Sequence, residues 1–386
     1  MPNPTPAPWR QWGENLDPAA VAQMRQAAAL PIAVQGALMP DAHTGYGLPI
    51  GGVLATENAV IPYAVGVDIA CRMRLSVIDM PPQALDRQRD LFRRALRDGT
   101  CFGVGGAFPL SQRRNHPVMD ADWSASPVTQ RGRDKAWSQL GTSGSGNHFV
   151  EFGLMTLDAP LDGLAPGVYL ALLSHSGSRG IGADVATHYS RLAEAQHPEV
   201  PHALRHLAWL GLKHDAGREY WAAMTLMGRY AAANHALIHA AILRATGAEA
   251  LATVENHHNF AWRESHGGRT VVVHRKGATP AGAGVLGVIP GSMAAPGFVV
   301  RGRGHPDSLN SASHGAGRCM SRRQAFKRLT PEMLRSALDK AGVELLAGGL
   351  DEAPMAYKNI RQVMRAQADL VDVIARFDPR LVLMAK

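Results

Sequence analysis

Four short runs of apolar and β-branched residues predict strands. The runs are MRLSVIDM (73–80), VYLALLS (168–174), TVVVHR (270–275) and FVVRG (298–302), and they alternate irregularly with segments of helical periodicity. Runs of this length and composition are typical of strands. We therefore expect an α+β fold in which mixed sheets and helices surround a central cleft.

Helical periodicity marks other parts of the chain. The segment 81–99 opens with proline, places Leu85, Phe92 and Leu96 at roughly helical spacing and ends at Gly99. Residues 203–246 form an Ala-rich helical region before Gly247, and Thr330 with Pro331 begins another helix. A final helix is expected over about 355–376, with apolar positions at Met355, Ile360, Met364, Leu370 and Ile374.

Composition indicates a folded globular protein. The chain has 386 residues and 46% hydrophobic content, enough for a large core, and length alone would allow two or three domains. The candidate motifs extend from residue 41 to the C-terminus without a linker-like tract, so we expect one domain over 1–386. Residues 1–12, which are rich in proline, are expected to form a flexible arm. The formal charge of +8 fits an anionic partner such as RNA and fits solubility almost as well.

Cysteine usage and the N-terminal residues favour the cytoplasm. Cys71, Cys101 and Cys319 are odd in number and widely spaced, which argues against a disulfide framework and against a CxxC zinc module. The N-terminal residues lack the apolar stretch of a secretory signal, and no run of 18 apolar residues occurs. We expect a cytoplasmic protein that does not bind or cross a membrane.

Metal-type ligands occur in short Gly-rich motifs. Alone, Cys71 is typical of a buried small hydrophobe and Asp68 of a turn, but the D-x-x-C spacing joins them as candidates. Of the pair His257 and His258, we expect only one to be a ligand. Together, carboxylate, thiolate and imidazole can hold one or two divalent transition ions. The candidates are Asp68 and Cys71 in VGVDIACRM, His148 in GTSGSGNHFVE, His175 in SHSGSRG, and His257 and His258 in ENHHNF.

Most of the 17 histidines are expected to be surface or core residues. Six of them lie in predicted helices and are not taken as site candidates: His188, His202, His206, His214, His235 and His239.

One histidine stands apart as a candidate nucleophile. His314 lies in SASHGAGRCMSR, where small neighbours leave its ring accessible. The segment 301–328 that surrounds it holds Arg318 and Arg322 among seven Lys and Arg residues, with Asp307 as its single acid. A solvated basic face is the simplest interpretation, but the position around SHGAGR favours phosphate contact, because arginine binds phosphate in a bidentate fork.

Common nucleotide-binding motifs are absent. The chain contains no Gly-Lys pair and hence no Walker A motif. A match to GxGxxG at Gly282, Gly284 and Gly287 runs into Pro290 and Gly291, where a Rossmann turn should open a helix. We interpret this match as a coincidence within a Gly-rich loop.

The ordered motifs resemble those of the RtcB family of RNA ligases. The strings MPDAHTGYGLPIGG, VGVDIACRM, GTSGSGNHFVE, SHSGSRGIG, HHN, RKGAT, PGSM, SHGAGR and APMAYKNI occur in the family's order over residues 39–386. The resemblance implies an RtcB-like fold and GTP-dependent joining of an RNA 2′,3′-cyclic phosphate or 3′-phosphate end to a 5′-hydroxyl end, with manganese, two ions being expected. tRNA, cleaved ribosomal RNA and other broken RNAs meet this description. As protein partners the resemblance suggests an archease-like activator or a release-factor-like repair protein.

The resemblance also assigns roles to single residues. His314 matches the nucleophile that becomes a covalent histidine–GMP, and Asp41 matches a carboxylate near it. Matches to the metal ligands are Asp68, Cys71, which bridges two ions, His148, His175 and His258, which directly precedes the asparagine. Matches to guanylate-binding positions are Asn147, Phe149, Glu151, Asn259, Pro290, Gly291, Ser292, Met293, Ala316, Gly317, Tyr357 and Lys386. Arg179 and Lys276, together with the basic Arg318 and Arg322, are expected to contact RNA phosphates.

Two details depart from the family pattern. Gly297 stands where many relatives have a serine, which removes one hydrogen bond to phosphate or ribose, and the chain stops at Lys386 without the glycine that many relatives carry. Ligand softness would favour zinc at a site of cysteine and histidine, so manganese rests on the resemblance and not on ligand type.

Three function classes follow from these residues. An RNA ligase is the leading one. A metal-dependent phosphodiesterase could use the same ions, and a nucleotide-binding regulator could keep the pocket without turnover. His314 separates them, because neither a hydrolase nor a regulator needs that histidine in a loop of small residues.

Overall fold

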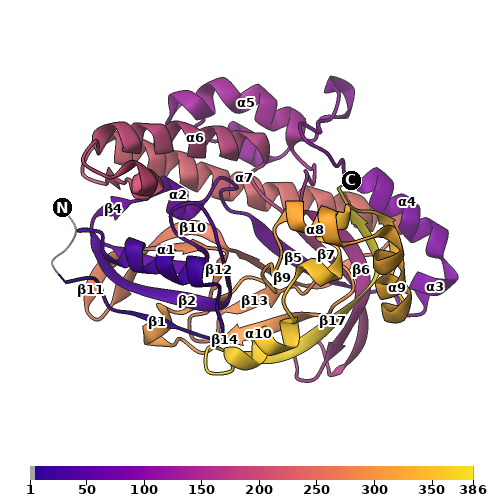
Figure 1. Ribbon diagram of the computed structural model, residues 1–386. Helices are drawn as coiled ribbons and strands as arrows, with labels where there is room; N and C mark the ends of the chain where they lie inside the picture. The colour runs from indigo at the N-terminus through magenta and orange to yellow at the C-terminus, as the bar shows by residue number, and fades with distance from the viewer. Residues whose placement is uncertain (1–4, 386) are drawn as a thin grey trace.

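A computed structural model describes residues 5–385 and shows two main sheets (Figure 1). The first has the order β1 (Trp9–Gln11), β2 (Ala33–His43), β3 (Ile50–Thr56), β11 (Arg269–Lys276) and β10 (Asn259–His266). The second has the order β13 (Leu286–Ile289), β14 (Gly297–Gly302), β17 (Val371–Met384), β6 (Phe149–Leu157), β7 (Gly167–Ser176), β5 (Arg72–Ile78) and β9 (Ala250–His257), and β16 (Glu344–Ala347) also pairs with β17. Short ladders join β4 (Ala59–Val60) to β8 (Leu210–Gly211) and β12 (Ala278–Pro280) to β15 (Ser311–Ser313).

Helices cover the sheets, and α5, α6 and α7 lie together along one side of the molecule (Figure 1). The α-helices are α1 (Pro18–Ala28), α2 (Pro62–Val65), α3 (Ala84–Arg87), α4 (Arg89–Gly99), α5 (Pro127–Gln139), α6 (Arg179–Gln196), α7 (Asp215–Thr246), α8 (Arg322–Arg328), α9 (Pro331–Ala341) and α10 (Ile360–Ala366). The 3-10 helices are η1 (Leu110–Gln112), η2 (Pro117–Asp120), η3 (His202–Leu207), η4 (Pro306–Ser308), η5 (Leu350–Glu352) and η6 (Pro354–Ala356). None of the described helices has the length and apolar character needed to span a membrane.

The expected α+β fold and most of its strands are confirmed. All four predicted strands form, and β13 begins at Leu286, within the GxGxxG match at 282–287, so the match opens no helix. Helix α9 starts as predicted, because the Thr330 side chain accepts a hydrogen bond from the backbone N–H of Met333 and Pro331 fills the first turn. It ends at Gly342, whose φ of 64° suits glycine.

The predicted helix over 355–376 is wrong for most of its length. Only Ile360–Ala366 is an α-helix, and Val371–Met384 forms the long strand β17. β17 pairs with β6 on one side and β14 on the other, so the hydrogen bonds of two neighbours outweigh the helical spacing of its apolar residues. The apolar residues 381–384 form the last part of β17.

Three further boundaries differ from the predictions. The helix over 81–99 divides into α3 and α4, and the region 203–246 begins with η3 and β8 before α7. In place of a flexible arm, Trp9–Gln11 pairs in parallel with β2, and Ala7 and Trp12 are buried. Residues 1–4 of the expected arm lie outside the described residues.

Candidate active site

Neighbouring strand ends of the second sheet bring the metal-type ligands together. His148 directly precedes β6, His175 lies near the end of β7, and Cys71 directly precedes β5. In the sheet, His175 pairs with Phe149 on one neighbouring strand and with Met73 on the other. These three strands therefore bring the ligand-bearing ends of their segments side by side. His258 follows β9, the neighbour of β5 on its other side. The sheet order β6-β7-β5-β9 therefore gathers ligands that lie far apart in the sequence.

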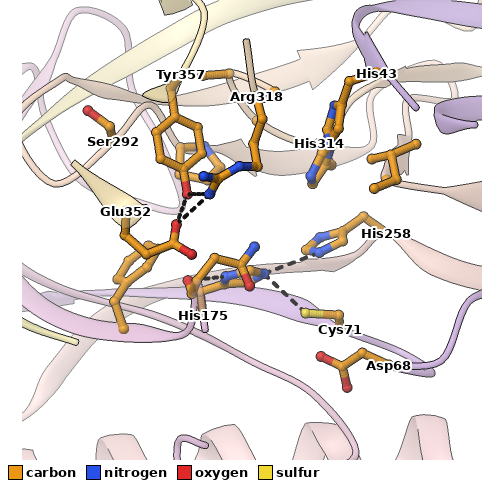
Figure 2. A pocket seen from close by; sticks show the side chains of 18 of the residues that line it. His43, Asp68, Cys71, His175, His258, Ser292, His314, Arg318, Glu352 and Tyr357 are labelled. Carbon is orange, nitrogen blue, oxygen red and sulfur yellow. Dashed lines mark hydrogen bonds and ion pairs between the residues drawn. The ribbon is translucent and has the colours of Figure 1, made fainter. Parts of the chain in front are cut away.

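Cys71 lies at the centre of the cluster (Figure 2). Its Sγ is 3.1 Å from His175 Nε2 and 3.6 Å from His148 Nε2. His148 Nε2 lies 2.9 Å from Asp68 Oδ2, and His175 Nε2 lies 3.3 Å from His258 Nε2. The potential ligands form two groups that share the thiol, Cys71 with His175 and His258, and Cys71 with Asp68 and His148. Each group could supply ligands to a divalent ion.

Backbone carbonyls fix the orientation of two imidazoles. The Nδ1 of His148 lies 2.8 Å from the Ser143 carbonyl oxygen, and the Nδ1 of His175 lies 3.0 Å from that of Asn147. A carbonyl can only accept, so each Nδ1 donates to its carbonyl and each Nε2 faces the cluster. Such contacts orient metal-binding histidines in general.

Burial sets the charge of the cluster. It lowers the pKa of His175 to about 3 and that of His258 well below the usual value, so both imidazoles are neutral at pH 7. Burial and the Asp68 carboxylate raise the pKa of the Cys71 thiol. Burial opposes ionisation of Asp68, but the hydrogen bond from His148 and the charge of Arg179 lower the pKa of Asp68 below its usual value. A bound divalent cation would favour the ionised thiolate of Cys71. A thiolate together with neutral imidazoles and a carboxylate is a donor set that fits a transition metal.

The other histidine of the ENHHNF motif points elsewhere. The His257 ring contacts Phe260 and Trp262, with ring centroids 5.0 Å apart in both cases. The structure therefore brings His258, and not His257, into the cluster.

His314 lies beside the cluster and is held by a buried carboxylate. Its ring centroid is 4.9 Å from that of His258. Its Nδ1 lies 2.7 Å from Asp41 Oδ2 on β2, and its backbone N–H donates to the same oxygen at 3.2 Å. Asp41 is fully buried, whereas the His314 side chain is 17% exposed and lines the pocket. Because Nδ1 is engaged, Nε2 is the nitrogen available to a ligand.

A cavity of about 420 Å³ adjoins His314 and the cluster. Its size suits a small-molecule ligand. Burial raises the pKa of Glu151 well above its usual value, and the buried Ser292 hydroxyl has no hydrogen-bond partner among the described residues. Both are polar groups available to a ligand. The guanylate candidates that line the cavity are Asn147, Phe149, Glu151, Asn259, Pro290, Gly291, Ser292, Met293, Ala316, Gly317 and Tyr357.

The end of β17 reaches the same cavity. Met384 pairs with Phe149 in the sheet and lines the pocket. Lys386, the last guanylate candidate, lies outside the described residues, two positions beyond Met384.

Arg179 and Lys276, two of the four expected RNA contacts, bond to neighbouring groups of the protein. The Arg179 guanidinium donates to Thr142 Oγ1 at 3.1 Å and lies 3.4 Å from His148 Nδ1, and Arg179 does not line the cavity. Lys276 lines it and donates to the Tyr46 carbonyl, and burial lowers the pKa of Lys276 to about 7.

Arg318 and Arg322 also line the cavity, but two acids hold them. Arg318 donates to Glu352 Oε2 at 3.1 Å (Figure 2), and Arg322 pairs with both Asp351 and Glu352. Glu352 also accepts a hydrogen bond from the Tyr357 hydroxyl. Sequence analysis missed both acids, because the segment 301–328 contains only Asp307. The signal that the sequence offered was the position of Asp351 and Glu352 directly before the motif APMAYKNI.

Sequence analysis also missed a buried network on α7 behind the cluster. The Asn234 side chain donates to the Thr142 carbonyl at 2.9 Å and accepts from the Gly141 N–H at 2.6 Å. The Ser174 hydroxyl lies 2.7 Å from His235 Nδ1 and 2.9 Å from His239 Nε2. These contacts fix the loop before His148 and the strand that carries His175. Helical periodicity marks such residues only as core positions.

Comparison with known proteins gives consistent matches. The family model described as "tRNA-splicing ligase RtcB" matches residues 23–126 and 112–385. The RNA-splicing ligase RtcB of Escherichia coli strain K12 is 36% identical over 95% of this chain and 95% of its own length. The RNA-splicing ligase RtcB of Mycobacterium tuberculosis is 32% identical over 92% of this chain and 98% of its own. The tRNA-splicing ligase RtcB of Thermococcus kodakarensis is 30% identical over 89% of this chain and 86% of its own length.

Proposed function

The chain belongs to the RtcB family of RNA ligases, and from this premise we propose that it seals RNA in a GTP-dependent reaction. The reaction joins an RNA 2′,3′-cyclic phosphate or 3′-phosphate end to a 5′-hydroxyl end. One observation carries the proposal: the His314 imidazole lies beside the metal-type cluster and lines the same cavity, with Asp41 on its Nδ1.

The first step follows from that hydrogen bond. Asp41 keeps the proton on Nδ1, so the lone pair of His314 Nε2 attacks the α-phosphorus of GTP. A nitrogen–phosphorus bond forms, the bond to the β-phosphate oxygen breaks, and pyrophosphate leaves. Glu151, Ser292 and Tyr357 line the space proposed for guanosine.

Two transfers complete the reaction. An oxygen of the RNA 3′-phosphate attacks the phosphorus, the bond to Nε2 breaks, and GMP becomes attached to the RNA end. The 5′-hydroxyl oxygen then attacks the RNA 3′-phosphorus, GMP departs and the phosphodiester is formed. A cyclic phosphate is first opened by water. Covalent catalysis of this kind divides one difficult displacement into easier ones.

Asp68, Cys71, His148, His175 and His258 would hold the metal ions. When bound, divalent ions neutralise phosphate charge and stabilise the entering and departing oxygens. We propose manganese from the family resemblance, although thiolate and imidazole by themselves favour zinc.

A joining assay tests this function. One RNA strand carries ³²P in its 3′-phosphate, and the other has a 5′-hydroxyl. With GTP and Mn²⁺, the proposal predicts a longer product whose label resists phosphatase, because the labelled phosphorus lies in the junction. A phosphodiesterase would shorten the strands, and a nucleotide-binding regulator would leave them unchanged. Either result contradicts the proposal.

A further inference from the structure

One side of the cavity is lined mainly by residues that are not guanylate candidates. In Figure 2, Tyr357, Ser292 and Glu352 lie on one side of His314, and His43 lies on the other. Beyond His43, the lining comes from the loop after β2 (Thr44, Gly45 and Tyr46) and from the segment before Asp68 (Tyr63, Gly66 and Val67). If guanylate occupies the first side, the second side is open to another part of the substrate.

Tyr46 is held in an exposed position on this second side. Its side chain is 67% exposed although it lines the cavity. Its loop is nevertheless fixed: Gly45 N–H donates to Gln23 Oε1 at 3.0 Å, Gln23 Nε2 donates to the Gly45 carbonyl at 2.6 Å, and Lys276 donates to the Tyr46 carbonyl. Because these bonds hold the backbone beside the exposed ring in place, little further ordering is needed when a ligand binds to the ring.

Neighbouring rings set the orientation of Tyr46. Its ring lies 5.7 Å from that of His206 at an interplanar angle of 87°, and His206 lies 4.2 Å from Tyr63. The backbone at Gly47, with φ of 69°, approaches the His206 carbonyl so closely that a side chain would not fit. A perpendicular contact uses at most one face of Tyr46, so another face is free for a planar group.

Arg205 and Lys276 lie near this aromatic cluster, and Glu194 Oε1 lies 3.3 Å from His206 Nδ1. Burial and the charges of Arg205 and Lys276 lower the pKa of His206, while Glu194 opposes this shift. An exposed aromatic ring beside cations is the combination with which proteins bind single-stranded nucleic acid, because the ring stacks on a base and the cations attract the phosphates.

We propose that Tyr46 is a stacking platform for a nucleobase at one of the two RNA ends, supported by His206 and Tyr63. This inference rests on the proposed function, because that function makes single-stranded RNA the substrate. It adds a base-binding subsite to the side of the cavity that His43 and Tyr46 line.

The test measures RNA affinity with the base present or absent. Two oligonucleotides, one ending in a 3′-phosphate and one in a 5′-hydroxyl, are each prepared with 2-aminopurine at the terminal nucleotide and in a matched abasic form. Binding is measured for the unchanged protein, Tyr46→Ala and Tyr46→Trp. Phe326→Ala is the control, because Phe326 is 59% exposed and does not line the cavity.

For at least one strand, Tyr46→Ala should weaken binding of the base-containing form about tenfold, as expected for loss of one stacked base. Tyr46→Trp should retain the affinity and the quenching of 2-aminopurine, and the abasic form should bind the unchanged protein and Tyr46→Ala equally. Equal affinities of these two proteins for both base-containing strands, or an equal loss in Phe326→Ala, would overturn the inference. Guanylylation of the unchanged protein is measured separately: its absence contradicts the proposed function, while the binding data still decide the role of Tyr46.

Discussion

His314 Nδ1 lies 2.7 Å from Asp41 Oδ2, and the same carboxylate oxygen accepts the backbone N–H of His314. Asp41 is fully buried on β2, so the carboxylate fixes both the ring orientation and the tautomer of the proposed nucleophile.

Asp41→Asn should therefore slow guanylylation without loss of the fold. The amide NH₂ can donate to Nδ1, which moves the proton to Nε2 and removes the nucleophilic lone pair. We expect a rate about 100-fold or more below that of the unchanged protein, as for other buried aspartates that orient a catalytic histidine. The measurement is the rate of label transfer from α-labelled GTP. Asp307→Asn, which alters an exposed ion pair with Arg10, is the control. An unchanged rate in Asp41→Asn would show that Asp41 does not set the tautomer.

Lys276 should make stability depend on pH. Its folded pKa of about 7 lies below the ordinary value of 10.5, so the unfolded chain binds more protons between these pH values. The contribution of Lys276 to the free energy of unfolding of the protein therefore rises as pH increases from about 7 to 10.5. At about 1.4 kcal/mol per pKa unit, the difference amounts to a few kcal/mol.

Urea unfolding isolates the contribution of Lys276. It is measured for the metal-free protein and for Lys276→Met at several pH values between about 7 and 10.5. The stability of the unchanged protein relative to Lys276→Met should increase with pH. Parallel curves would show that Lys276 is charged in the folded protein at all these pH values.

Gly297→Ser should improve the use of GTP. Gly297 lines the cavity, and a Cβ atom there would lie 3.4 Å from Pro290 Cα, an ordinary contact distance. A hydroxyl group would add a hydrogen bond to phosphate or ribose, so the GTP concentration for half-maximal guanylylation should fall severalfold. Gly297→Ala supplies the methylene without the hydroxyl and should not reproduce the gain. If both variants behave alike, position 297 does not contact the nucleotide.

Asn234→Ala should weaken metal binding from behind the cluster. Its side chain holds the Gly141–Thr142 backbone, and the adjacent Ser143 carbonyl orients His148. Loss of groups that orient metal ligands typically costs about 10- to 100-fold in affinity. Cobalt titration, followed by the thiolate-to-cobalt absorption, reports this effect directly. Tyr230→Phe removes another buried hydrogen bond of α7, to the Ala136 carbonyl, and should leave cobalt affinity unchanged. Equal cobalt affinities of Asn234→Ala and the unchanged protein would limit Asn234 to a role in folding.

Sequence patterns predicted the elements whose structure is determined locally. The run VYLALLS forms β7, and Thr330 with Pro331 begins α9. The pattern failed at 371–376, where helical spacing competes with pairing to β6 and β14, and at Trp9–Gln11, where a short strand depends on β2. Such pairing joins residues far apart in the chain and leaves little local signal.

The same distinction holds for the site. Short motifs predicted Cys71, His148, His175 and His258 as candidate metal ligands, and the structure brings their side chains together at one end of neighbouring strands. The motifs did not reveal that Glu352 holds Arg318 and Arg322, because that contact depends on how η5 packs against α8. The arginines are thus partly neutralised within the cavity, a property that the basic segment alone does not show.

Covalent labelling by GTP tests the central claim most directly. The protein is incubated with α-labelled GTP and Mn²⁺, and the label is tested for acid lability and alkali stability and then mapped by mass spectrometry. We predict one GMP on His314, lost in His314→Ala and retained in His188→Ala, which alters an exposed histidine of α6. Label at the unchanged level on His314→Ala, or on another residue of the unchanged protein, would contradict the assignment of His314 as the nucleophile.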